Sequence, residues 1–144
     1  MSALCKPEDV VAAARGYKGT PFRHQGRTRF GLDCVGLIIT VAKELNLMKC
    51  DFLGYSKDVQ IKDGFMPRFR EAGLKEVQFE DRRIGDVLVM HENRFPCHAA
   101  FITSLEPMSV IHAYARRRRV VEERYTSALH AQFAGLFRFP QFQT

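Results

Sequence analysis

The stretch GLDCVGLIITVAKEL, residues 31–45, is the strongest indication of local structure in the sequence. Asp33 is a favourable N-cap, so a helix is expected to begin there with Cys34 in its first turn. A thiol at that position is either a small buried hydrophobe or a nucleophile. The apolar side chains that follow recur with the 3.6-residue period of a helix and form one broad stripe: Leu37, Ile38, Val41, Ala42 and Leu45.

Length and composition predict one compact domain. The chain has 144 residues, of which 46% are hydrophobic and 26% charged, so a disordered chain is excluded. No repeat or linker interrupts the sequence, and we expect residues 1–144 to fold together. No apolar run approaches the roughly 20 residues that cross a bilayer. Residues 1–19 lack the pattern of a secretory signal, so we expect synthesis in the cytoplasm without a signal peptide.

The charge of the chain favours an anionic partner. The formal net charge is +6, and residues 116–119 are four consecutive arginines. Nucleic acid, anionic lipid and an acidic cell-wall polymer all fit such a surface, and a basic face that only contacts solvent fits equally well. A nucleic-acid-binding module would need aromatic side chains for base stacking, and only Tyr114 and Tyr125 are near. We therefore rank nucleic acid last among the partners.

The remaining sequence predicts helices first and strands afterwards. Pro7 and Gly19 bound a short N-terminal helix, residues 20–32 form a polar loop, and residues 60–74 are a weaker helix candidate. This order predicts an α+β fold with an antiparallel sheet. Short β-branched or alternating runs indicate strands at 76–79, 86–91, 98–103, 109–115, 118–123 and 135–139, with a short helix at 126–132 before the last of them.

Two histidines fall on one face of the predicted sheet. A hairpin centred on Leu105 would pair His98 directly with His112, with Cβ atoms about 4.5–5.5 Å apart. The second ring could then fix the tautomer and orientation of the first, as in a nucleophilic triad. Two histidines that merely bond backbone groups on a half-buried sheet are the alternative.

The position of Cys34 suits nucleophilic chemistry. A helix N-terminus lowers the pKa of a thiol, and its free N–H groups can hold an oxyanion, so we expect a reactive thiolate. Gly36 lacks a side chain and could let a substrate backbone approach.

A metal site is the other explanation for cysteine and histidine side chains close in sequence. His91, Cys97 and His98 are candidates, but consecutive residues of a strand point to opposite faces, and no zinc-ligand spacing is present. The four cysteines, at positions 5, 34, 50 and 97, also lack a disulfide pattern, which fits a reducing compartment. The sequence predicts no metal and no other cofactor.

Several motifs together resemble the NlpC/P60 family of papain-like cysteine peptidases, most closely its bacteriophage and prophage branch. They are GTPFRHQGRTRFGLDCVGL (19–37), RIGDVLVM (83–90), CHAAFI (97–102) and VIHAYA (110–115), in the family's order. The resemblance spans about residues 8–140. It implies a papain-like fold in which a helix carrying the cysteine at its N-terminus packs on an antiparallel sheet that carries the histidines.

The resemblance also implies roles for individual residues. Cys34 is the nucleophile, His98 the general base, and His112 the third polar residue, which orients His98. Asp33 is similar to the residue that positions the cysteine and the amine end of the substrate. The implied reaction is hydrolysis of peptidoglycan stem peptides, typically between D-γ-glutamyl and a diamino acid.

Two departures from the family's pattern concern substrate binding. Phe22 stands where many members have tyrosine, and Val35 where many have serine. Arg23 and His24 could supply polar contacts to substrate carboxylates instead.

The absence of an export signal favours a phage or prophage tail-associated hydrolase, assembled with other tail proteins in the cytoplasm and carried to the wall in the particle. Use as an endolysin is an alternative to the tail-associated role. The competing interpretations are a tail-assembly protein that keeps the fold without hydrolysis, and a Cys/His acyltransferase.

Overall fold

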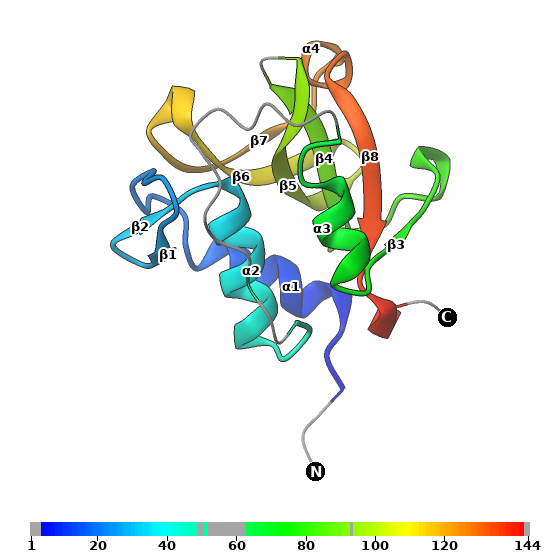
Figure 1. The fold of residues 1–144 in the computed structure, drawn as a ribbon, viewed down its shortest axis with the longest axis horizontal. Helices are drawn as coiled ribbons and strands as arrows, with labels where there is room; N and C mark the ends of the chain where they lie inside the picture. The colour runs from blue at the N-terminus through cyan, green and yellow to red at the C-terminus, as the bar shows by residue number, and fades with distance from the viewer. Residues whose placement is uncertain (1–3, 49–50, 52–62, 93, 143–144) are drawn as a thin grey trace.

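The computed structural model describes residues 4–48, 51, 63–92 and 94–142, and Figure 1 shows their arrangement. No helix among these residues is long and apolar enough to cross a membrane. The helices of the described residues are α1 (Pro7–Arg15), α2 (Cys34–Glu44), α3 (Met66–Glu71) and α4 (Ser127–His130).

An antiparallel sheet forms the centre of the molecule. Its strands lie in the order β3-β8-β4-β5-β6-β7, and each neighbouring pair is antiparallel. The predicted α+β class is therefore confirmed. The strands are β3 (Lys75–Glu76), β4 (Val87–Glu92), β5 (Phe95–Leu105), β6 (Met108–Tyr114), β7 (Arg119–Arg124) and β8 (Phe133–Arg138).

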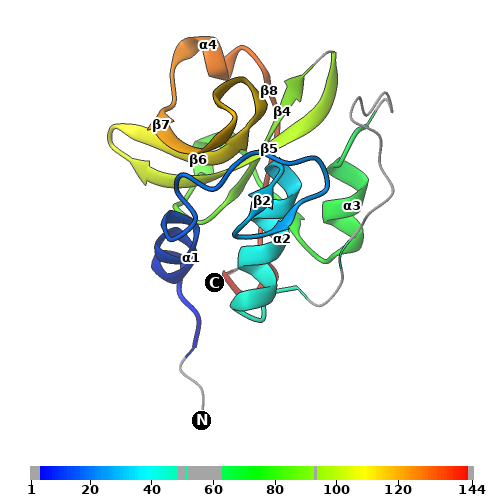
Figure 2. The ribbon, with the colours of Figure 1, turned by 90° about the vertical axis from the view of Figure 1, so that its left-hand side faces the viewer.

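Alternating side chains bury both faces of this sheet. Val89 and Phe101 belong to a core that the sheet shares with α1 and α2. Leu88 and Ile102, which point the other way, belong to a second core with residues from the connection between β7 and β8. Figure 2 shows α1 and α2 on one face of the sheet and α4 on the other.

Helix α2 begins where the sequence predicts. Asp33 is its N-cap, and its carboxylate accepts a hydrogen bond from the N–H of Gly36 at 2.7 Å. The predicted stripe packs inward, because Leu37, Ile38 and Val41 have no exposed surface. The N-terminal helix is also confirmed and occupies Pro7–Arg15.

Two short elements differ from the predictions. The expected loop 20–32 contains a small hairpin of β1 (Arg27–Thr28) and β2 (Gly31–Leu32), whose two-residue strands are too short to show a period in the sequence. The predicted strand 76–79 is limited to Lys75–Glu76, and the chain turns into a single 3-10 turn at Phe79–Asp81.

The weaker helix candidate, residues 60–74, is helical only in α3, at Met66–Glu71. Residues 60–62 of that segment lie outside the described residues, as does Cys50. The expected short helix at 126–132 is α4, a single turn.

The predicted pairing of β5 with β6 is wrong by two residues. A tight turn pairs Leu105 with Met108, and a bulge between Ile102 and Ser104 then shifts the register so that Ile102 pairs with Val110. His112 is therefore diagonal to His98 rather than opposite to it. This bulge brings the two histidines to the same face of the sheet. Without it, the register set by the turn would place them on opposite faces.

Candidate active site

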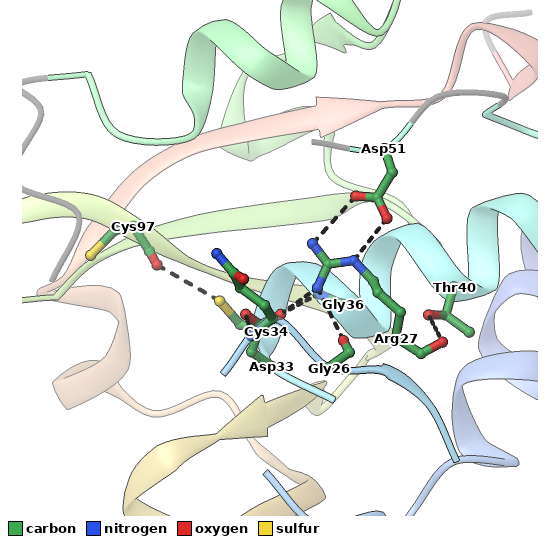
Figure 3. A network of polar contacts seen from close by, with 9 residues as sticks. Gly26, Arg27, Asp33, Cys34, Gly36, Thr40, Asp51 and Cys97 are labelled. Atoms are coloured by element: carbon green, nitrogen blue, oxygen red, sulfur yellow. Dashed lines mark hydrogen bonds and ion pairs between the residues drawn. The ribbon is translucent and has the colours of Figure 1, made fainter. Parts of the chain in front are cut away.

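A network of polar contacts around Asp33 fixes the start of α2 (Figure 3). The Asp33 side chain is almost fully buried, and besides the Gly36 N–H it accepts from the Gln25 N–H at 2.8 Å and from Arg27 Nη1 at 3.1 Å. Arg27 also donates to Asp51 at 2.9 Å. The network fastens the loop before β2 onto the helix end that carries the candidate nucleophile. These contacts support a positioning role for Asp33, whereas its contact with a substrate amine stays a prediction.

The role expected for Gly36 is wrong. A Cβ on Gly36 would overlap with the carbonyl oxygen of Gly26, so the missing side chain makes room for the protein's own loop and not for a substrate. The glycine therefore allows the Asp33 network to close.

The thiol of Cys34 lies against the backbone of β5 on either side of His98. The sulfur is 3.7 Å from the carbonyl oxygen of Cys97 and accepts a hydrogen bond from the N–H of Ala99. Ile102 directs its N–H and C=O toward the β4 side, so the groups of Cys97 and Ala99 point toward β6.

The described ladder between β5 and β6 ends at Phe101 and Ile111. The thiol therefore lies beyond the end of this pairing, against the backbone on either side of His98.

The two histidines form a chain of hydrogen bonds with an acidic residue of β7. His98 Nε2 is 2.7 Å from His112 Nδ1, and His112 Nε2 is 2.7 Å from Glu123 Oε2. Tyr114 stacks on His112 with 4.6 Å between ring centres and an interplanar angle of 18°, and also contacts the ring of His98. His98 is 5% exposed and His112 is fully buried, so both rings are held by packing as well as by hydrogen bonds.

The electrostatics differ from the expected thiolate. Burial raises the pKa of the Cys34 thiol far above its ordinary value, the Asp33 carboxylate raises it further, and the Ala99 N–H opposes the rise only in part. Burial also lowers the pKa of His98 well below its usual range, and His112 adds to this effect. The shifts favour the neutral form of the thiol and of the His98 imidazole, so the helix N-terminus does not dominate the pKa of Cys34.

A cavity of about 620 Å³ opens beside His98. Its wall includes Met90 and Leu129 on the apolar side and Glu123 and Arg117 on the polar side. A volume of this size accommodates a short peptide.

The three other predicted substrate-binding residues lie on the loop before α2. The N–H of Phe22 donates to the carbonyl of Arg118 at 2.8 Å, and that of Arg23 donates to the carbonyl of Leu32 at 3.0 Å. Phe22 and His24 are partly buried, while Arg23 is exposed. The backbone thus ties this loop to the arginine segment and to β2, and substrate contacts of the three side chains stay predictions.

The run Arg116–Arg119 is exposed throughout. It forms the turn between β6 and β7, where Arg118 has a positive φ of 62°, and only Arg119 belongs to β7. Arg116 and Arg117 border the cavity beside His98, so part of the basic run faces the candidate site.

Outside this site, the described cysteines and histidines are not arranged to bind a metal. Of the described cysteines, none forms a disulfide bond: Cys5, Cys34 and Cys97. Among the described residues, no group of three or more His, Cys, Asp or Glu is placed to hold a metal ion. His91 instead contacts the carbonyl oxygen of Gln132 at 3.3 Å.

Solved structures with similar architecture include peptidoglycan hydrolases. The chain superposes on the NlpC/P60 domain of the peptidoglycan hydrolase SagA with a TM-score of 0.65 and 19% identity, covering 93% of this chain and 99% of that domain. An NlpC/P60 family protein from Bacillus cereus gives 0.69 and 18%, covering 95% of this chain and 41% of its own. The peptidoglycan hydrolase RipB from Mycobacterium tuberculosis gives 0.61 and 14%, covering 92% and 64%.

The chain has the NlpC/P60 fold. It spans the whole SagA domain but less than half of the Bacillus cereus protein. Neither a family model nor a curated protein matches the sequence itself.

Two polar residues of this NlpC/P60 fold are missing from the sequence-based site. Arg27 joins Asp33 to Asp51, and Glu123 bonds His112. The alternation of the segment 118–123 does place Glu123 on one face of a strand, but the sequence contains no signal that this face meets His112.

Proposed function

We propose that the protein is a cysteine peptidase that hydrolyses amide bonds in peptidoglycan stem peptides. The observation that carries the proposal is the placement of the Cys34 thiol at the N-terminus of α2, against the backbone flanking a histidine that is hydrogen-bonded to a second histidine at 2.7 Å. The hydrolases among proteins with this fold, SagA and RipB, support the same substrate class.

The proposed reaction begins with a neutral pair. His98 takes the proton of Cys34 as the sulfur attacks the carbonyl carbon, and the same imidazole then gives that proton to the departing amine as the C–N bond breaks. Water, deprotonated by His98, attacks the resulting thioester and releases a carboxylic acid and the free thiol.

The oxyanion of each addition step needs nearby donors. The Gly36 N–H is used by the helix cap, so we assign this role to the N–H groups of Cys34 and Val35 at the start of α2.

The surface around the site suits an anionic peptide. Stem peptides carry free carboxylates, and Arg116 and Arg117 border the cavity next to His98. We propose the D-γ-glutamyl–diamino acid bond as the one that is cleaved. We also propose a tail-associated role in a phage or prophage, with synthesis in the cytoplasm and other tail proteins as partners.

Mass spectrometry of purified peptidoglycan after incubation with the protein tests the proposal. Fragments with a new γ-D-glutamyl terminus are expected. Cys34→Ala should abolish their formation, and His98→Ala should do so almost completely, because nucleophile and base act as a unit. His112→Ala should be milder, with a loss of about 10- to 10³-fold. Cys5→Ala, which removes a free thiol outside the site, is the matched control and should retain full activity.

Three outcomes would contradict the proposed cysteine peptidase. An unchanged wall digest would favour a tail protein that keeps only the fold. Fragments joined to an added amine would indicate an acyltransferase. Full activity of Cys34→Ala would exclude the thiol as nucleophile.

A further inference from the structure

We propose that Glu123 is a positioning residue that sets the tautomers of both imidazoles, so that the bare nitrogen of His98, the one that receives a proton, is Nδ1. The tautomers can be measured without any substrate. Only the catalytic consequence rests on the proposed function.

The hydrogen-bond chain runs from the partly exposed Glu123 through His112 to His98. His112 is fully buried, and its Nε2 lies 2.7 Å from Oε2 of Glu123. A carboxylate only accepts hydrogen bonds, so the proton of this contact belongs to His112 Nε2. A carboxylate next to a histidine commonly fixes its tautomer in this way.

The tautomer of His112 determines the tautomer of His98. A neutral imidazole has one N–H, so Nδ1 of His112 is bare and accepts. Its partner at 2.7 Å is Nε2 of His98, which must then donate. The lone pair of His98 is consequently on Nδ1. Burial lowers the pKa values of both rings, in His112 against the opposing effect of Glu123, and so favours these neutral forms.

A second carboxylate could impose the opposite order. Glu92 Oε2 lies near Nδ1 of His98, and a proton there would reverse both tautomers and leave two acceptors, His112 Nε2 and Glu123, facing each other at 2.7 Å. The Glu92 contact is 3.9 Å long, beyond hydrogen-bond distance. The shorter contact, between Glu123 and His112, therefore determines which ring nitrogens carry the protons, and the longer Glu92 contact does not.

The surroundings keep Glu123 in place as an acceptor. Arg117 Nη2 lies 3.8 Å from its other oxygen, Oε1. Its side chain is 26% exposed, whereas the His112 ring it contacts is fully buried, so the carboxylate links the site to solvent. Tyr114 packs on the rings of both histidines and keeps them from rotating out of the chain.

The variant that tests this role is Glu123→Gln. Its amide can donate to His112 Nε2, which would move the proton of each ring and place an N–H at Nδ1 of His98. We expect kcat for stem-peptide hydrolysis to fall about 10- to 10³-fold with a smaller change in KM, because the change of tautomer acts on the proton transfers of the chemical step. Glu123→Asp, which keeps the carboxylate, should recover part of the loss.

The adjacent Glu122 provides a matched control. It points to the other side of β7 and pairs with Arg15 at 2.8 Å and Lys18 at 2.7 Å. Glu122→Gln removes the same charge one residue away, so it should lower stability while leaving tautomers and kcat unchanged.

Nitrogen NMR of the full chain with ¹⁵N-labelled histidine measures the tautomers directly. The wild type should carry the proton on Nε2 of both His98 and His112, and Glu123→Gln should shift it toward Nδ1. A wild-type His98 protonated at Nδ1, or tautomers and kcat that Glu123→Gln leaves unchanged, would overturn the inference. Tautomers as expected in a protein that cleaves no peptidoglycan would support the positioning role and refute the proposed function instead.

Discussion

Replacing Asp33 by alanine removes the acceptor that holds three donors at the start of α2. The carboxylate caps the helix through the Gly36 N–H, binds the Gln25 N–H and pairs with Arg27, all from a side chain that is only 4% exposed. We expect a large loss of stability, because all three donors lose the carboxylate that they share.

The magnitude follows from the individual contacts. Loss of an N-cap costs about 1 kcal/mol. A poorly solvated N–H at Gln25 costs about 1–3 kcal/mol. The charge contact of Arg27 adds about 1 kcal/mol, a small amount because Arg27 keeps its bond to Asp51. The sum is about 3–5 kcal/mol, which is a substantial part of the roughly 5–15 kcal/mol that stabilises an ordinary domain.

Urea unfolding followed by circular dichroism measures this loss as a shift of the midpoint at constant slope. The control is Asp9→Ala, which removes an exposed carboxylate that accepts from the Lys6 N–H at 2.8 Å and should cost no more than about 1 kcal/mol. A loss for Asp33→Ala no larger than that of Asp9→Ala would refute the reasoning. It would mean that water replaces the carboxylate at all three donors.

Three further predictions concern other parts of the molecule. Gly36→Ala should lower the free energy of unfolding by about 1–3 kcal/mol, because its Cβ would displace the Gly26 carbonyl, and an unchanged melting temperature would contradict the close contact. Hydrogen bonds from Arg15 and Lys18 lower the pKa of Glu122 to about 2, so its contribution to stability is complete above the unfolded pKa near 4.3 and is lost as the pH falls toward 2. Melting temperatures of wild type and Glu122→Gln should therefore converge over that interval, and a constant difference would argue against the ion pairs. Replacing Arg116–Arg119 with glutamine should weaken cosedimentation with cell walls most at low salt, whereas equal binding at all ionic strengths would leave the run as a solvated surface.

The main helix and the longer strands could be predicted from the sequence, as could Cys34, His98 and His112 as candidate site residues. The 3.6-residue stripe and the Asp33 cap specify α2 and its first residue, because both signals act within one or two helical turns. The alternation of the strands likewise places His98 and His112 among the strand residues that could share a face. Such patterns are local, and no distant part of the chain is needed to interpret them.

Only the tertiary structure decided how these elements meet. The tight turn and the bulge at Ile102–Ser104 set the register that makes the two histidines diagonal neighbours, and register depends on turn geometry that hydrophobic alternation does not encode. The pairing of β7 with β6 brings Glu123 to His112. Burial against β5, which no short segment specifies, raises the pKa of the Cys34 thiol despite its place at a helix N-terminus.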